Sequence, residues 1–309
     1  MPDVSIIIPV YNIKTLLPRC VASLQAQTWQ DFEVWLVDDG STDGSGPLCD
    51  ELAVKDARIH VLHKENGGQG LARDLGLDHA QGEYICYVDS DDEVLPNLLE
   101  DALRAAREAD ADIVCYGYYK QPLDGEGNAL QRSGPRLPAL SGVYTYEEFW
   151  KNFRKAKYES MPVVRLYRRD YLQKYSIRFT SLRVGEDAHF LTQLLDAPFR
   201  RIVYLRSAYY IYNIRPSSTM TSFQKAYFGD EAAARRAGLA SEEVTIHVTE
   251  YAGHARKLAR AAAQQAATEG VPLRIYTAGG DGTFMEAMTG VQGLSLIHIS
   301  EPTRLQLIS

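Results

Sequence analysis

Short apolar runs rich in β-branched residues alternate with segments of helical periodicity along the first third of the chain. The runs are VSIIIPVY, FEVWLV, RIHVLH, YICYVD and ADIVCYGYY, and the helical segments between them cover residues 13–29, 45–56, 69–80 and 95–109. In the first of these segments Leu17, Val21 and Leu24 recur at helical spacing, and Pro18 lies near the first turn, where a missing amide is tolerated. This alternation predicts βαβ units and a largely parallel sheet.

The pattern changes after residue 120. Residues 121–143 are rich in proline and glycine, which predicts an exposed excursion or lid. A helix (YTYEEFWKNFRKA), a strand (MPVVRLYRR), a helix (AHFLTQLL) and a strand (RIVYLRSAYYIYNI) are expected next. Beyond about residue 222 come an Ala/Arg-rich stretch, EVTIHVTEY, the helix GHARKLARAAAQQAATEG and RIYTAGGDGTF. We therefore predict a first domain over residues 1–222, an uncertain junction over 223–240 and a separate fragment from 241 onward.

Composition and charge narrow the class of protein. With 45% hydrophobic and 24% charged residues, the chain can bury a sizeable core. The 33 basic and 40 acidic residues give a net charge of −7, which argues against nucleic acid as a partner. The 4 cysteines are widely spaced and are expected to be reduced and mostly in the core. No leader and no run of bilayer length is seen, so we expect a cytoplasmic protein, with peripheral association at the inner face of the cell membrane left open.

Polar loops follow three of the predicted strands. They read DDGSTDGS, KENGGQG and DSDDEV. Open α/β sheets bind ligands outside the carboxyl ends of their strands, so each loop falls where a nucleotide could lie.

The loop DSDDEV carries two hypotheses. In extended chain, Asp89 and Asp91 would point to the same side. Two carboxylates about 5 Å apart repel by roughly 3 kcal/mol at an effective dielectric near 20, which favours either a protonated acid or a bound cation. Oxygen ligands of this kind suit Mg²⁺ or Mn²⁺. The alternative is that Ser90, Asp91 and Asp92 only cap a helix that begins near Leu95.

The other two loops are open to two interpretations as well. A carboxylate at Asp38 or Asp39 can accept hydrogen bonds from a base imide or a ribose hydroxyl, although DDGSTDGS is also simply a good turn. The glycines of KENGGQG permit close backbone approach, and Arg73 in the following helix could offer a fork to a phosphate.

Taken in order, VSIIIPVYN, VDDGSTDGS, ENGGQGLARDLGLDHAQGEYICYVDSDD and GEDAHF resemble the family 2 glycosyltransferases of the GT-A fold, an α/β fold with a mostly parallel sheet flanked by helices. The resemblance covers residues 3–222 and implies that Asp89 and Asp91 coordinate a divalent metal. One departure is Asp74, where relatives often carry Asn. The nucleotide-sugar pocket that the resemblance implies comprises Pro9, Tyr11, Asn12, Asp38, Asp39, Arg73, Asp89, Ser90 and Arg215.

The motif GEDAHF bears on catalysis. The family's matching pair implies that Glu186 and Asp187 belong to the catalytic centre, with Asp187 as general base. Transfer needs such a group, because the acceptor hydroxyl must lose its proton as it attacks the anomeric carbon. A retaining double displacement would use a second, nucleophilic carboxylate, so the resemblance implies inversion. The alternative is that both acids only complement the dipole at a helix start.

The carboxyl-terminal part resembles something else. Gly279, Gly280, Asp281, Gly282, Thr283 and Glu286 resemble the diacylglycerol kinase catalytic module over residues 241–293. The module's opening strand and its β-rich half are missing, so we expect the fragment to be inert. The segment LSLIHISEPTR, residues 294–304, resembles a reading-frame translation of a transposase adapter used in sequencing libraries. We therefore predict a chimeric sequence with an artefactual tail over 294–309.

These observations predict an inverting glycosyltransferase that uses Mn²⁺ or Mg²⁺. It would move a sugar from a nucleotide-diphosphate sugar, expected to be a UDP-sugar, to a hydroxyl of a glycan or lipid-linked glycan in bacterial cell-surface polysaccharide biosynthesis. Two alternatives stay open: a nucleotide-sugar-binding module without turnover, and a lipid kinase acting through the GGDGT fragment.

Overall fold

The computed structural model describes residues 1–156, 161–180, 186–215, 254–269, 276–277 and 306–307. The chain divides into two compact units, Met1–Ser218 and Thr219–Ser309. The predicted domain limits fall near this division, and the junction over 223–240 lies outside the described residues.

The first unit begins with the predicted alternation of strands and helices. Four strands lie side by side and parallel in the order β3-β2-β1-β4: β1 (Val4–Val10), β2 (Phe32–Asp38), β3 (Ile59–His63) and β4 (Tyr84–Tyr87). The helices between them are α1 (Leu17–Gln25), α2 (Ser45–Lys55) and α3 (Gln69–His79). All of β1 is buried, as expected for a strand that is covered on both faces of a parallel sheet.

The second half of this unit makes the sheet mixed. Its strands are β5 (Glu93–Val94), β6 (Ile113–Pro122), β7 (Gly142–Tyr144), β8 (Arg165–Arg168) and β9 (Ile202–Ile214). Its helices are α4 (Leu98–Ala109), α5 (Tyr146–Ala156), the short 3₁₀ turn η1 (Pro162–Val164), α6 (Arg169–Lys174) and α7 (Glu186–Asp196). Strand β8 enters antiparallel between β4 and β6, which gives the order β3-β2-β1-β4-β8-β6-β9-β5 with β7 on β9.

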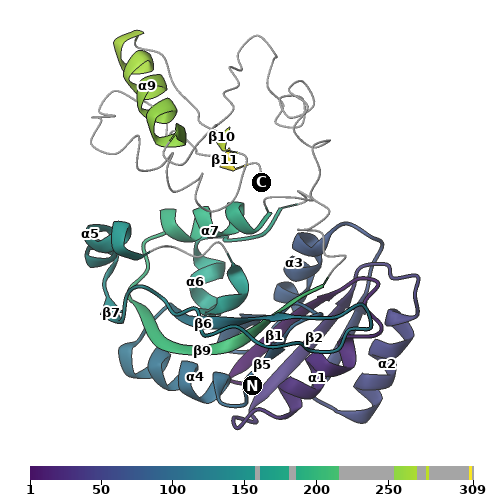
Figure 1. Cartoon of the computed structure of the whole chain (residues 1–309). Helices are drawn as coiled ribbons and strands as arrows, with labels where there is room; N and C mark the ends of the chain where they lie inside the picture. The colour runs from purple at the N-terminus through teal and green to yellow at the C-terminus, as the bar shows by residue number, and fades with distance from the viewer. Residues whose placement is uncertain (157–160, 181–185, 216–253, 270–275, 278–305, 308–309) are drawn as a thin grey trace. The chain divides into compact units, whose positions relative to one another are not determined.

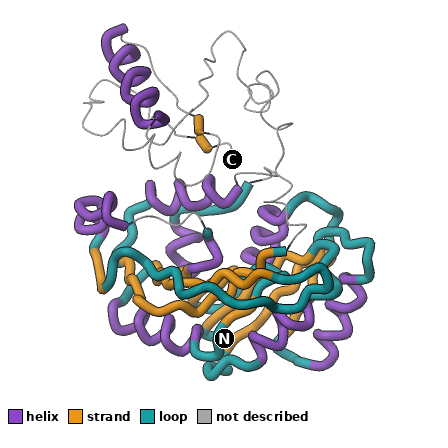
Figure 2. The backbone as a smooth tube through the Cα atoms, viewed as in Figure 1, coloured by secondary structure: helices purple, strands orange, loops and turns teal. Residues whose placement is uncertain are grey.

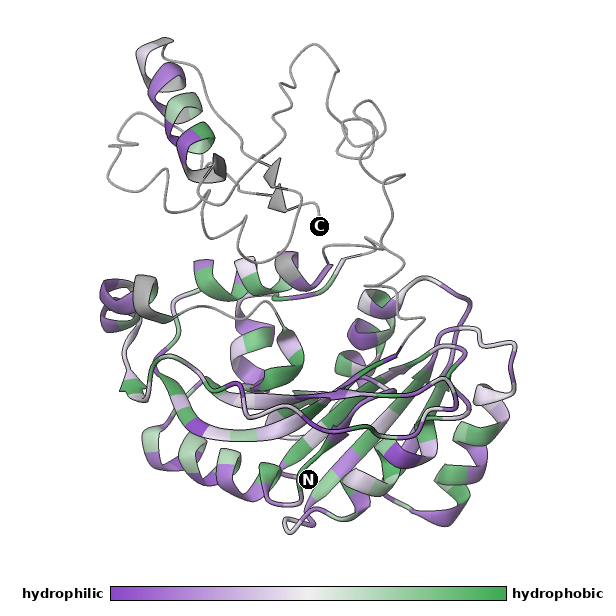
Figure 3. Cartoon of the chain, in the orientation of Figure 1, coloured by the Kyte–Doolittle hydropathy of each residue, from purple (hydrophilic) through white to green (hydrophobic). Residues whose placement is uncertain are grey.

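Helices cover both faces of this sheet (Figures 1 and 2). Because parallel crossovers are right-handed, the outward path from β1 to β3 places α1 and α2 on one face, and the return to β4 places α3 on the other. Helix α4 lies on the side of α1 and α2, whereas α6 and α7 lie on the side of α3. Hydrophobic residues concentrate along the central strands and the inner sides of these helices (Figure 3).

The acidic loop after β4 departs from the expected geometry. Strand β4 ends at Tyr87, and the next residues form a turn in which the Asp92 amide donates to the Asp89 carbonyl at 3.0 Å. The prediction of extended chain at Asp89 and Asp91 is therefore wrong. The capping alternative is also wrong, because α4 begins only at Leu98, after β5 has paired with β9.

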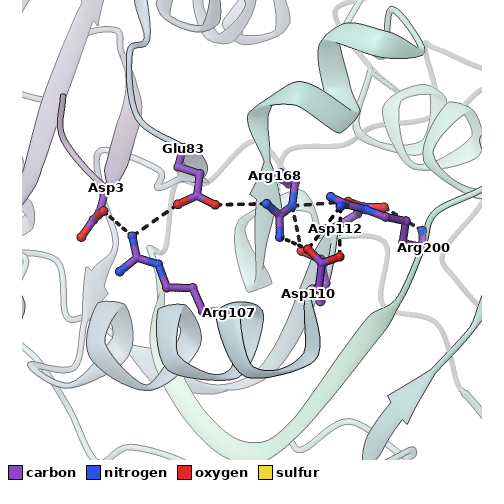
Figure 4. A network of polar contacts seen from close by, with 8 residues as sticks. Asp3, Glu83, Arg107, Asp110, Asp112, Arg168 and Arg200 are labelled. Carbon is purple, nitrogen blue, oxygen red and sulfur yellow. Dashed lines mark hydrogen bonds and ion pairs between the residues drawn. The ribbon is translucent and has the colours of Figure 1, made fainter.

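A network of ion pairs ties the amino ends of the strands together (Figure 4). Arg168, at the end of antiparallel β8, contacts Glu83 at 3.0 Å, Asp110 at 2.9 Å and Asp112 at 3.4 Å. The network continues through Arg107 to Asp3 and Glu83, and through Arg200 to Asp110 and Asp112. The network lies at the amino ends of the parallel strands, whereas the acidic turn follows the carboxyl end of β4.

Within the second unit, helix α9 (His254–Glu269) confirms the helix predicted from GHARKLARAAAQQAATEG. Strand β10 (Tyr276–Thr277) pairs in parallel with β11 (Gln306–Leu307). The predicted strand EVTIHVTEY, the GGDGT segment and residues 294–304 lie outside the described residues. Among the helices that the structure describes, none combines the length and apolarity needed to span a bilayer.

Candidate active site

Arg73 joins two of the predicted acidic sites. Its Nη2 atom lies 2.7 Å from Asp89 Oδ1, and its Nη1 atom lies 2.8 Å from Asp187 Oδ1. The three residues come from α3, the turn after β4 and the first turn of α7. Burial acts to lower the pKa of Arg73, but the Asp89 and Asp187 carboxylates outweigh it and raise the pKa, so the guanidinium stays charged. In this structure Arg73 therefore holds two carboxylates, instead of presenting both arms of its fork to a phosphate.

The surroundings of Arg73 explain how it is held. The guanidinium is only 1% exposed and lies 4.9 Å from the centre of the Phe179 ring, which stacks on Phe190 at 4.2 Å. A cation over an aromatic face is attracted by the ring's negative π surface. Both phenylalanines come from the second half of the unit, so that half packs against the site as well as supplying Asp187.

Glu186 and Asp187 have different surroundings although they are adjacent. Glu186 is buried and accepts a hydrogen bond from Gln69 at the start of α3. The Asp187 side chain is 36% exposed. Desolvation raises the pKa of Asp187 to about 7, helped by Glu186 and Asp89 and opposed by Arg73. A carboxyl with a pKa near the working pH is suited to general base catalysis.

Asp91, the second acid of the turn, lies beside Arg215, a residue of the predicted nucleotide-sugar pocket. Their Oδ2 and Nη2 atoms are 2.8 Å apart. Burial and the nearby Asp89 carboxylate raise the pKa of Asp91, and Arg215 opposes the rise. The turn therefore carries negative charge that the neighbouring arginines do not fully balance.

This donor set fits a hard divalent cation. One oxygen of Asp89 and one of Asp91 are paired with arginine, and their other carboxylate oxygens have no ion-pair partner among the described residues. Mg²⁺ is typically held by one or two carboxylates together with substrate phosphates, so two carboxylates are a sufficient share for the protein. A cluster of three or more His, Cys, Asp or Glu ligands does not occur in the described part of the chain.

The predicted base-binding acids are occupied by the protein's own donors. Asp38 accepts from the Ser41 amide at 3.0 Å and lies 3.0 Å from His63 Nδ1. Asp39 accepts from the amides of Gly67 and Gly68 at 2.9 and 2.8 Å, and from Lys64 at 2.5 Å. The glycine loop thus binds Asp39, and a role for either acid in base recognition stays a prediction.

The remaining predicted pocket residues lie on the same sheet edge. Pro9 is near the end of β1, and Tyr11 just beyond it is 52% exposed. Asn12 has a positive φ of 49° and accepts from the Thr42 amide at 2.8 Å. Ser90 lies within the acidic turn. The structure therefore gathers residues from β1, β2, α3 and the turn after β4 at one edge.

Four residues that were not among the predicted site residues are Asp92, Phe179, Tyr210 and Asn213. All four are buried and surround Asp89, Asp91 or Arg73. The one signal in the sequence was the density of acids, three in the four positions from Asp89 to Asp92.

Comparisons with known proteins agree with this architecture. A model described as glycosyl transferase family 2 matches residues 5–176, and a diacylglycerol kinase catalytic domain model matches residues 211–307. Both predicted resemblances are confirmed, the second over a longer stretch than expected.

Relatives and solved structures resemble the first part of the chain. The uncharacterized glycosyltransferase EpsJ of Bacillus subtilis is 33% identical over 228 residues, which cover 71% of this chain and 63% of EpsJ. The glycosyltransferase GlyG of Streptococcus pneumoniae is 44% identical over 126 residues, 40% of this chain and 42% of GlyG. The crystal structure of S. aureus TarS 1–349 in complex with UDP-GlcNAc matches with a TM-score of 0.59 and 27% identity, over 75% of this chain and 63% of that one.

These matches fix the family and the fold. The chain spans 63% of the length of EpsJ. The family model matches more than half of the chain, and the sheet with its flanking helices is similar to that of TarS. The chain therefore belongs to glycosyl transferase family 2, and its first unit has the GT-A fold.

Proposed function

We propose that this chain is an inverting, metal-dependent glycosyltransferase that moves a sugar from a UDP-sugar to a hydroxyl of a glycan or lipid-linked glycan. One observation carries the proposal: the buried guanidinium of Arg73 pairs with both Asp89 and Asp187. Arg73 thereby holds Asp89, a candidate metal ligand, and Asp187, the candidate base, next to one guanidinium group. The similarity to TarS bound to UDP-GlcNAc supports a UDP-sugar donor. The similarity to bacterial glycosyltransferases supports sugar transfer, and the role in cell-surface polysaccharide biosynthesis is proposed from the family resemblance.

The base in this mechanism is Asp187. Its side chain is partly exposed, and its pKa of about 7 leaves a large ionised fraction at neutral pH. It would accept the proton of the acceptor hydroxyl as the oxygen attacks the anomeric carbon. Arg73 holds Asp187 in place through one arm of its fork. Glu186 is engaged by Gln69, so Asp187 is the acid of this pair that is open to the acceptor, as a single displacement requires.

Asp89 and Asp91 would hold the cation. When bound, Mn²⁺ or Mg²⁺ supplies positive charge that stabilises the departing diphosphate. Arg215, paired with Asp91, adds a positive charge beside the same group.

The direct test is a turnover assay with Mn²⁺ and a panel of UDP-sugars. Asp91→Ala should abolish both donor hydrolysis and transfer. Asp187→Asn should bind UDP as the parent does and fail to transfer sugar. Equal transfer by Asp187→Asn and the parent would exclude Asp187 as the base. Turnover that is unaffected by a chelator would exclude a requirement for the metal.

Two other functions are separated by simple assays. A binding module without turnover would bind UDP with Mn²⁺ in calorimetry and release no sugar product. The match to the diacylglycerol kinase model motivates an assay with radiolabelled ATP and diacylglycerol. Phosphorylated diacylglycerol would support a lipid kinase, and we expect none.

A further inference from the structure

The acidic turn packs against β9, the final strand of the first unit. Asp92, the last acid of the turn, is 0% exposed, and so is Tyr210 on β9, while Asn213 on the same strand is 3% exposed. Asp89 and Asp91, by contrast, have side chains that are 28% and 22% exposed. One acid of the turn therefore points into the protein, and the other two stay accessible.

The Tyr210 hydroxyl bridges the two ends of the turn. It accepts a hydrogen bond from the Asp89 amide at 3.2 Å and lies 2.6 Å from Asp92 Oδ2. Because a backbone N–H can only donate, the hydroxyl uses its own proton for Asp92. This one atom therefore fixes the backbone at Asp89 and the side chain at Asp92 together.

Asn213 holds the middle and the end of the turn. Its backbone amide donates to Asp92 Oδ1 at 2.7 Å, and its side-chain Nδ2 donates to the Asp91 carbonyl at 2.7 Å. Both carboxylate oxygens of Asp92 are thus bound from β9. The backbone of the turn is held at Asp89 by Tyr210 and at Asp91 by Asn213.

The hydrogen bonds from β9 oppose the electrostatic repulsion between the carboxylates of the turn. Asp89, Asp91 and Asp92 lie within four residues, and in their ionised forms these carboxylates repel one another. Without the donors from β9, the turn would relax by moving its carboxylates apart. With them, Asp92 is held inside and the backbone that carries Asp89 and Asp91 is fixed.

We infer that Asp92, Tyr210 and Asn213 are positioning residues that set the spacing of the Asp89 and Asp91 carboxylates for a divalent cation. The inference rests on the proposed function, because it takes the metal role of Asp89 and Asp91 from there. Outer partners of metal ligands typically contribute about 10- to 100-fold to metal affinity or activity.

The test measures Mn²⁺ binding to the full chain by electron paramagnetic resonance at fixed UDP, and metal-free UDP binding by calorimetry. Tyr210→Phe removes only the bridging hydroxyl, and we expect the Kd for Mn²⁺ to rise about tenfold with metal-free UDP affinity unchanged. Asn213→Ala removes the bond to the Asp91 carbonyl but keeps the backbone amide, and should act in the same direction. A purely structural loss would weaken both kinds of binding in parallel.

Tyr209→Phe is the matched control. Tyr209 is the adjacent residue of β9, is 6% exposed and also donates to a carboxylate, that of Asp101, at 3.0 Å, but it does not contact the acidic turn. We expect its Kd for Mn²⁺ to match that of the parent. Thermal unfolding of each variant shows whether it folds, and if Tyr210→Phe does not fold, Asn213→Ala decides.

The outcomes distinguish a failure of the proposed function from a failure of this inference. If the parent chain binds no Mn²⁺ in the presence of UDP, the proposed function fails and this inference fails with it. If the parent binds Mn²⁺ and both β9 variants bind it equally well, the inference is overturned and the proposed function stands. The inference is also overturned if Tyr209→Phe weakens Mn²⁺ binding as much as Tyr210→Phe does.

Discussion

Replacing Asp74 with asparagine should stabilise the chain at neutral pH. Asp74 is half-buried on α3, and its Oδ1 accepts from the Phe179 amide at 3.0 Å. Burial raises the pKa of Asp74 from 3.8 to about 6, against the opposing effect of the Phe179 hydrogen bond. A rise of about two units corresponds to roughly 3 kcal/mol at about 1.4 kcal/mol per unit. Asparagine keeps the acceptor and removes the charge, so we expect a gain of about 1–3 kcal/mol, the lower values reflecting partial solvation.

The pH dependence gives the sign of the effect. The folded pKa of Asp74 lies above the unfolded value, so this group's contribution to stability is fully present below about pH 4 and is lost as the pH rises through about 6. The advantage of Asp74→Asn should therefore be near zero at about pH 4 and complete above about pH 7. Urea unfolding of both full chains at about pH 4 and pH 8 measures it.

A neighbouring aspartate supplies the control. Asp78 lies one turn further along α3, is 55% exposed and pairs with Arg178 at 2.7 Å, so Asp78→Asn should change stability by less than about 1 kcal/mol at either pH. An advantage of Asp74→Asn that is equal at both pH values, or a loss of stability at pH 8, would refute the reasoning.

Further predictions concern the base, the glycine loop and the ion-pair network. The proposed base Asp187 would act in its ionised form, and its pKa is about 7, so kcat/KM for transfer should fall about tenfold per pH unit below that value and level off above it, and a flat profile from about pH 5.5 to 8 would contradict this role. Gly70→Ala should cost about 1–3 kcal/mol in urea unfolding, because its Cβ would lie 2.5 Å from the Thr180 carbonyl oxygen, whereas Gly125→Ala, in open space, should be near neutral. Arg168→Ala should destabilise the fold by about 3 kcal/mol, because it leaves three acidic partners without this cation. It should leave UDP affinity unchanged in calorimetry, because these partners lie at the end of the sheet opposite to the site.

Local pattern accounts for much of the first unit. The buried runs at β1, β2 and β4 and the helices between them follow from periodicity and turn chemistry, which act over a few residues. The polar loops at the carboxyl ends of these strands were predictable for the same reason. The family motifs then pointed to Asp89, Asp91 and Asp187, whose roles stay a proposal, and no local signal showed their mutual arrangement.

The errors arose where distant segments decide the geometry. The acidic loop was expected to be extended or to cap a helix, but pairing of β5 with β9 forces it into a turn. The predicted fold class is confirmed, but local pattern did not show that β8 inserts antiparallel between β4 and β6. Strand direction depends on the path of the whole chain, which periodicity within one strand does not encode.

The sequence by itself determined which residue types stand at the edge of the sheet, since strand periodicity and glycine-rich turns are local properties. Only the tertiary structure decided which of them meet. Arg73 was expected to bind phosphate, yet it pairs with Asp187, which is 114 residues away. Asp92 looked equivalent to its neighbours, yet Tyr210 and Asn213 draw it inside. The physical reason is that burial and charge pairing are set by the packing of many distant segments at once, so the same carboxylate can be a ligand, a base or an internal anchor.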